Sequence, residues 1–193
     1  KGDYLLLLNN DTEVITSNWI ELMLGTCARS DVGCVGVKLF YPDGTIQHAG
    51  VVVCGSGADH LNKYIPRGVH GYFGLDDLQQ DLSAVTAACL MVSTKDFDAV
   101  GGFTEELAVA FNDVDFCLKL RERDLLVVYN PEVELYHYES ISRGGETTVE
   151  KEIRFRQEFS YLMNRWASYY VLGDPYSNPN FDISIPKDRY YHL

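Results

Sequence analysis

Two carboxamides and a carboxylate, Asn9, Asn10 and Asp11, directly follow an apolar run at residues 4–8. A continuously apolar run of this length is typical of a strand covered on both faces, as in a parallel sheet. Ligands of open α/β sheets gather beyond the carboxyl ends of such strands, where a carboxylate can hold a hard divalent cation. A plain turn explains the same residues equally simply, because Asn and Asp favour turns.

A second acidic segment, Asn112-Asp113-Val114-Asp115, opens a predicted helix at residues 112–123. A carboxylate at a helix N-terminus is stabilised in its ionised form by the helix dipole. Asp113 can therefore accept a proton from an attacking hydroxyl, as a general base does. Helix capping by Asp113 or Asp115 is the alternative interpretation.

A third polar segment contains His137 and Arg143 and follows a predicted short strand. An imidazole can complete a Mn²⁺ site that a carboxylate begins, although a lone His is more often structural. The stretch Ser142-Arg143-Gly144-Gly145 offers a cation and flexible backbone amides, which suit a diphosphate. A solvated loop is the other interpretation of this stretch.

The composition narrows the classes of partner. A formal net charge of −12 argues against nucleic-acid binding, which needs a basic stripe to neutralise phosphates. An acidic protein can still bind a phosphate-bearing substrate when a divalent cation lies between them. No apolar run approaches the roughly 18 residues that a membrane helix needs. The five Cys residues lack a CxxC pair, so we expect buried free thiols, which suit a reducing compartment, and no zinc site.

The remaining pattern alternates strands with helices. Strands are predicted at residues 4–8, 32–40, 46–54, 85–92, 125–129 and 133–137, and helices from a Ser17 cap to about residue 28 and at residues 94–100, 112–123 and 146–172. A Pro-Gly turn at residues 41–44 predicts a hairpin between the two strands beside it. Residues 55–81 are expected to form a long loop, a kind of segment that often carries function. The pattern predicts an α/β fold with a mixed sheet flanked by helices.

Several segments, taken in order, resemble the inverting, family-2 glycosyltransferases of the GT-A type, in particular a rhamnosyltransferase-like subgroup. These segments are residues 6–14, similar to the DxD-type segment; residues 87–92 and 97–103, similar to the acceptor-side strand and the segment after it; residues 111–120, similar to the ED-containing helix; residues 137–144, a His-x-Glu-Ser-x-Ser-Arg-Gly pattern; and residues 174–180. The resemblance covers nearly the whole chain.

The resemblance implies a role for each polar segment. Asp11 would be the metal-binding carboxylate for Mn²⁺ or Mg²⁺, and His137 would bind the metal or the diphosphate. Asp113 would be the catalytic base, and Arg143 would lie near the leaving group. Asn9 and Asn10 would help to bind the cofactor.

Two residues depart from the family pattern, because Asn9 stands where many members have the first Asp and Asn112 where they have Glu.

The reaction that the resemblance implies is a single displacement with inversion. It moves a sugar from a nucleoside-diphosphate sugar to a glycan or lipid-linked acceptor in bacterial polysaccharide or cell-envelope glycan synthesis.

The implied fold is a truncated GT-A, Rossmann-like domain. Residues 1–145 would form its metal-binding and acceptor-side part, and residues 146–193 a long C-terminal helix with an extended tail. The family places a nucleotide-binding βαβ region before the DxD-type strand, so we expect the isolated chain to be inactive. We also expect a cytoplasmic protein, associated peripherally with the inner face of the membrane through other parts of the full-length protein, and no nucleic-acid partner.

Other functions stay open on the sequence. Asn9 and Asn112 favour a non-catalytic glycan-binding or scaffold module with a decayed site. A metal-dependent hydrolase and a structural interaction domain are further alternatives. His48, His60 and His70 are candidates for an acceptor site, although surface positions explain them equally well.

Overall fold

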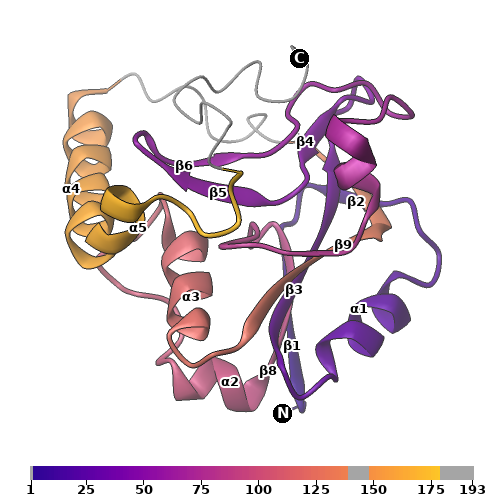
Figure 1. Cartoon of the computed structure of the whole chain (residues 1–193), viewed down its shortest axis with the longest axis horizontal. Helices are drawn as coiled ribbons and strands as arrows, with labels where there is room; N and C mark the ends of the chain where they lie inside the picture. Colours follow the sequence, from indigo (N-terminus) through magenta and orange to yellow (C-terminus); the bar gives the residue numbers. More distant parts are fainter. Residues whose placement is uncertain (1, 139–147, 179–193) are drawn as a thin grey trace.

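The computed structural model describes residues 2–138 and 148–178, and within them the chain folds around a mixed sheet of seven strands (Figure 1). The strands follow the order β1-β8-β3-β9-β2, with β4 on β3 and β7 on β9. Their bounds are β1 Tyr4–Leu8, β2 Thr12–Val14, β3 Val32–Phe40, β4 Ile46–His48, β7 Gln80–Asp81, β8 Cys89–Ser93 and β9 Leu126–His137. The predicted mixed α/β sheet is confirmed.

Strand β3 is the centre of this sheet, and all of its residues are buried. It pairs in parallel with β9 and antiparallel with β8 and β4. A Cβ at Gly36 would lie 2.5 Å from Cβ of Val85, so only glycine allows the close approach there. The apolar sequence of β3 fits a strand that is covered on both faces.

Strand β1 departs from the prediction. It lies at the edge of the described sheet and pairs antiparallel with β8, with Leu8 opposite Cys89. Tyr4 and Leu8 are 36% and 43% exposed, and only the middle residues pack on the core. The strand is confirmed, and its middle residues are partly covered on both faces, because Leu5 and Leu7 pack against one core cluster and Leu6 against the other. The expected parallel pairing is wrong for the residues described, since β1 pairs antiparallel with β8.

Residues 46–54 do not form one return strand. The hairpin across residues 41–44 joins β3 to β4, and the chain then leaves the sheet at Gly50, whose φ is +101°. Strand β5 (Val51–Cys54) instead pairs with β6 (Gly57–His60) in a separate two-stranded sheet. The expected long loop is therefore partly ordered, into β6, the 3-10 helix η1 (Tyr72–Asp77) and β7.

Helices cover both faces of the sheet (Figure 1). They are α1 Trp19–Cys27, α2 Thr94–Ala99, α3 Asn112–Arg121, α4 Val149–Arg165 and α5 Ala167–Leu172. Helix α1 packs its Met23 and Cys27 into one core cluster, whereas α3 and the C-terminal helices pack into the other.

Three details of the predicted elements are corrected. Helix α1 begins after Asn18, without a side-chain cap, so Ser17 is not the cap. The long C-terminal helix is broken at Trp166, whose indole is buried and bonded to Asp115. The two short strands around Pro131 are one strand, whose register against β3 shifts between Val37 and Lys38.

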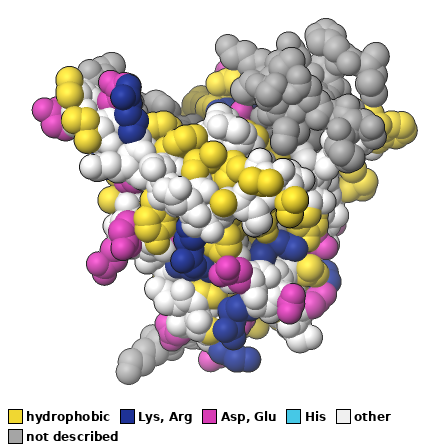
Figure 2. Space-filling view, turned by 60° about the vertical axis from the view of Figure 1, so that its left-hand side comes forward, with side chains coloured by type: hydrophobic (Ala, Val, Ile, Leu, Met, Phe, Trp, Pro, Cys, Tyr) yellow, Lys and Arg dark blue, Asp and Glu magenta, His cyan; other side chains and the backbone are white. Residues whose placement is uncertain are grey.

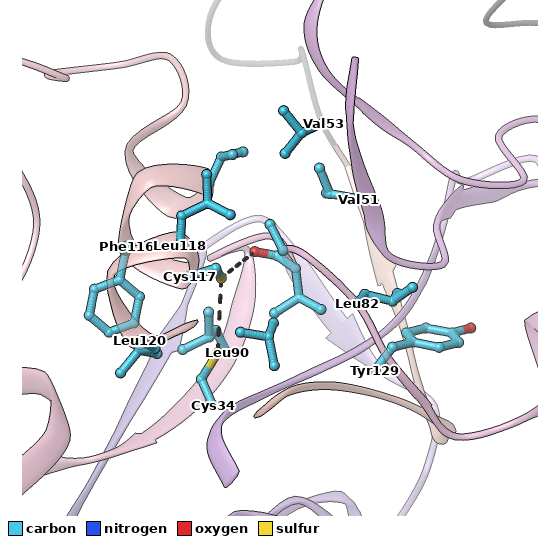
Figure 3. Close-up of a cluster of buried hydrophobic side chains, with 14 of the residues drawn as sticks. Cys34, Val51, Val53, Leu82, Leu90, Phe116, Cys117, Leu118, Leu120 and Tyr129 are labelled. Carbon is cyan, nitrogen blue, oxygen red and sulfur yellow. Dashed lines mark hydrogen bonds between the residues drawn. The ribbon is translucent and has the colours of Figure 1, made fainter. Parts of the chain in front are cut away.

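The cysteines are all free and buried, as predicted. Figure 3 shows Cys117 of α3 pointing at β3, where its Sγ lies 3.9 Å from Sγ of Cys34. Burial raises the pKa of the Cys27 and Cys89 thiols to about 12. These thiols are therefore protonated and unreactive at neutral pH.

The face that carries α4 is shown in Figure 2, where hydrophobic side chains gather across its middle between groups of charged side chains. At the end of α5, Val171 and Leu172 are 80% and 83% exposed. In the part of the chain that the structure describes, no helix is long and apolar enough to cross a membrane.

Candidate active site

One cleft of about 670 Å³ gathers side chains from the first, second and third polar segments of the sequence. Asn9 and Asp11 follow β1, Asp113 lies in the first turn of α3, and His137 ends β9, and all four line the cleft. Its walls also include residues 86–88, residues 109–111 and part of the β5–β6 hairpin. The fold thus brings together residues that are far apart in the sequence.

Strand pairing places Asp11 beside His137. Thr12 of β2 lies opposite His137 of β9, and the backbone N–H of Tyr138 donates to the carbonyl of Asp11 at 2.8 Å. As a result, Oδ1 of Asp11 lies 3.2 Å from Nε2 of His137. Nδ2 of Asn9 lies 3.1 Å from the same Nε2 atom.

Gln47 orients the His137 ring from the opposite side. Nδ1 of His137 lies 2.6 Å from Oε1 of Gln47, and Nε2 of Gln47 donates to the His137 carbonyl at 3.2 Å. Because an amide oxygen can only accept, Nδ1 carries the hydrogen and Nε2 keeps its lone pair. Gln47 was not singled out in the sequence, where it is an unremarkable polar residue in a predicted strand.

This geometry fits a divalent cation. A carboxylate oxygen and an imidazole lone pair converge on one point, and a hydrogen bond behind the ring fixes its tautomer, as is usual for metal-binding His. Over residues 2–138 and 148–178, no group of three or more His, Cys, Asp or Glu side chains could hold a metal. Asp11 and His137 would therefore supply two ligands, and oxygen atoms from elsewhere would supply the rest.

The other expected binding residues are not part of this pair. Asn10 is exposed and does not line the cleft. Arg143 lies outside the described residues.

Asp113 is held at the cleft wall by backbone amides. Its Oδ2 accepts a hydrogen bond from the Ala87 N–H at 3.1 Å, and its Oδ1 accepts one from the Val114 N–H at 2.9 Å. Burial raises the pKa of Asp113, and hydrogen bonds from Ala87, Thr86 and Val114 oppose that rise. The expected stabilisation of the ionised form at the helix N-terminus is thus outweighed, and a raised pKa makes the carboxylate a stronger base.

Asp115 behaves differently from Asp113. It is fully buried and accepts hydrogen bonds from Nε1 of Trp166 at 2.8 Å and from the Thr104 hydroxyl at 2.6 Å. Arg165 lies 3.2 Å from the same carboxylate. Asp115 therefore fastens α3 to the C-terminal helices, whereas Asp113 faces the cleft.

Helix α4 fixes the loop that precedes Asp113. The buried carboxylate of Glu158 accepts hydrogen bonds from the N–H groups of Val109 and Ala110 at 3.0 and 2.9 Å. Phe111 has a left-handed backbone, with φ +62°, and its ring packs against Phe155 and Phe159. Glu158 has no local signature in the sequence, because its partners are backbone groups about 50 residues away.

The three candidate His residues separate in the structure. His60 lines the cleft, and His48 is fully buried behind it. His70 is exposed, lies away from the cleft and contacts Asp77.

The chain is similar in sequence to several known proteins. No protein-family model matches the chain. It is 50% identical over 185 residues to the uncharacterized protein y4gI of Sinorhizobium fredii, with 95% of this chain and 20% of that protein covered. It is 35% identical to the O-antigen biosynthesis protein RfbC of Myxococcus xanthus, with 95% of this chain and 14% of that protein covered. The chain thus spans only a small part of the length of these two relatives.

Two further relationships concern enzymes of named activity or known structure. The chain is 22% identical to an N-acetylglucosaminyl-diphospho-decaprenol L-rhamnosyltransferase of Mycobacterium tuberculosis, with 87% of this chain and 57% of that enzyme covered. A crystal structure of GalNAc-T7 with UDP, GalNAc and Mn²⁺ covers 90% of this chain and 42% of that one, with a TM-score of 0.52 and 12% identity.

The chain is a relative of the GT-A glycosyltransferases. The predicted GT-A fold is thereby confirmed, and so is the resemblance to bacterial glycosyltransferases. As a GT-A relative, the chain places Asp11, Asp113 and His137 around one cleft.

Proposed function

We propose that this chain forms part of an enzyme that transfers a sugar from a nucleoside-diphosphate sugar to a hydroxyl group of a glycan or lipid-linked acceptor, with inversion. The observation that carries the proposal is the convergence of Asp113 and the Asp11–His137 pair on one cleft. The names of two relatives support bacterial polysaccharide or cell-envelope synthesis as the setting. We further propose a cytoplasmic location at the inner face of the membrane.

Asp113 acts as the general base in this mechanism. Its carboxylate accepts the proton of the acceptor hydroxyl while the hydroxyl oxygen forms a bond to the anomeric carbon. The bond from that carbon to the diphosphate breaks at the same time, and its electron pair leaves with the diphosphate. Amides of Ala87 and Val114 hold the carboxylate in place without taking all of its lone pairs.

Asp11 and His137 hold a divalent cation, Mn²⁺ or Mg²⁺, in the same proposal. When bound, the cation neutralises negative charge on the departing diphosphate. Gln47 keeps the Nε2 lone pair of His137 directed at the site. This arrangement also explains how a chain of net charge −12 accommodates an anionic donor. Arg143 remains a proposed contact of the leaving group.

The decisive test replaces Asp113 with Asn in the full-length protein. Transfer is assayed with UDP-, GDP- and dTDP-sugars in the presence of Mn²⁺, against p-nitrophenyl glycosides as acceptors. Loss of the base should lower kcat by about 100-fold or more, with a circular dichroism spectrum like that of the wild type. Unchanged turnover by Asp113→Asn would show that this carboxylate serves only the helix and would favour a different reaction in the cleft.

A further inference from the structure

A pair of imidazoles at the cleft wall, one buried and one half-buried, has no part in the mechanism above. Nδ1 of His48 lies 2.7 Å from Nδ1 of His60, and the two rings meet edge to face. His48 is fully buried, whereas His60 belongs to β6 and reaches the cleft. Burial lowers the pKa of His48 well below its usual value and that of His60 to about 3, so both rings are neutral at pH 7.

The hydrogen bonds of the pair define the tautomer of each ring. The backbone N–H of Thr86 points at Nε2 of His48 at 3.5 Å, so this nitrogen accepts and Nδ1 of His48 carries the hydrogen. His48 then donates to Nδ1 of His60, which must be unprotonated. A neutral imidazole holds one hydrogen, and in His60 this hydrogen is therefore on Nε2. His60 is a hydrogen-bond donor with a fixed tautomer, not a base.

The segment Thr86–Ala87 contacts both the imidazole pair and Asp113. The amide of Thr86 meets His48, and the amide of the next residue, Ala87, meets the Asp113 carboxylate at 3.1 Å. Both Thr86 and Ala87 line the cleft with His60 and Asp113. A hydrogen-bond donor, His60, and a proton acceptor, Asp113, are thus held by adjacent residues of one cleft wall. This arrangement is complementary to neighbouring hydroxyl groups of a sugar.

We propose that Nε2–H of His60 donates a hydrogen bond to a hydroxyl oxygen of the acceptor sugar and that His48 positions it by fixing its tautomer. This inference rests on the proposed function, because it assigns the acceptor to the wall that carries Asp113. His60 contributes to acceptor affinity and to the choice among hydroxyl patterns. In the proposed function, the Asp11–His137 pair binds the cation that contacts the nucleoside-diphosphate sugar.

The test compares His60→Leu and His60→Gln in the full-length protein, with the sugar donor and p-nitrophenyl glycoside that support transfer by the wild type. Losing one neutral hydrogen bond should raise the KM for the acceptor by about 3- to 10-fold, with the KM for the donor unchanged. His60→Gln can place an amide N–H near the position of Nε2 and should recover most of the affinity. His70→Leu is the matched control, because His70 is exposed and outside the cleft.

Monodeoxy versions of the same p-nitrophenyl glycoside give a second measurement. For the wild type, removal of the hydroxyl that His60 holds should raise KM, whereas for His60→Leu the same removal should have no further effect. An acceptor KM within twofold of the wild type in His60→Leu overturns the inference, as does an equal rise in the donor KM. If the wild-type protein transfers no sugar with any combination of sugar donor and acceptor, the proposed function is wrong, and this inference is wrong with it.

Discussion

Oε1 of Gln47 lies 2.6 Å from Nδ1 of His137, and this contact decides which nitrogen of the imidazole faces Asp11. The two residues are joined twice, since Nε2 of Gln47 also donates to the His137 carbonyl. A ring held in this way can rotate little, and its Nε2 lone pair, which lies 3.1 Å from Nδ2 of Asn9, is directed before any ligand arrives. Gln47 would therefore prepare the proposed cation site without touching the cation.

Replacing Gln47 with Leu should weaken Mn²⁺ binding by about 10- to 100-fold, because the ring loses the partner that fixes its tautomer. The Mn²⁺ concentration that gives half-maximal activity measures the effect in the full-length protein. Gln79→Leu is the control, since Gln79 is exposed and lies away from the cleft. Equal Mn²⁺ requirements in the two variants would rule out this role for Gln47.

Replacing Glu158 with Ala should destabilise the fold by about 1–3 kcal/mol, because two backbone N–H groups lose their buried acceptor. It should also lower kcat more than it changes the KM for either substrate, because the loop before Asp113 is released. Chemical denaturation and steady-state kinetics give the two readouts. Glu152→Ala on the same helix, where the carboxylate is exposed, should change stability by less than about 0.5 kcal/mol.

The raised pKa of Asp113 predicts how stability depends on pH. A carboxyl group whose pKa is higher in the folded state favours folding in its protonated form, so its contribution is present at low pH and is lost as pH rises through the folded-state pKa. At a pH above this raised pKa the ionised group opposes folding, and there Asp113→Asn should raise Tm. The gain in Tm should shrink at acidic pH, whereas a gain independent of pH would contradict this origin.

The buried thiols predict slow chemical modification. Native protein should react with a thiol-specific reagent such as DTNB much more slowly than protein unfolded in guanidinium chloride, because all five Cys side chains are buried. Absorbance of the released thiolate measures both rates. Rapid modification of even one thiol in the native protein would show that the packing around that side chain opens readily.

Local patterns predicted much of the secondary structure. The mostly apolar sequence of β3, the glycines after α2 and the acidic residues at the start of α3 are local signals, each contained in a few consecutive residues. The elements that they mark could therefore be predicted from the sequence. The edge position of β1 and the departure of β5 into a second sheet could not, because both depend on which strand pairs with which. The break at Trp166 likewise depends on Asp115, a tertiary partner.

The candidate site divides in the same way. Asp11, Asp113 and His137 were found because their residue types and order resemble those of a known family, and the structure brings them to one cleft. Gln47, Glu158 and the His48–His60 pair act through hydrogen bonds to distant groups. Such partners have no spacing rule in the sequence, so only the folded chain reveals them.

Because β2 pairs with β9, the position of His137 depends on the correct register between these two strands. Side chains alternate along a strand, so a slip of one residue in β9 would turn His137 to the opposite face and place Tyr136 or Tyr138 opposite Thr12 in its stead. In the proposed enzyme, such a molecule would keep most of its secondary structure yet lose its cation ligand. Titration with Mn²⁺ would then count the correctly registered molecules in a refolded sample, which circular dichroism could not distinguish.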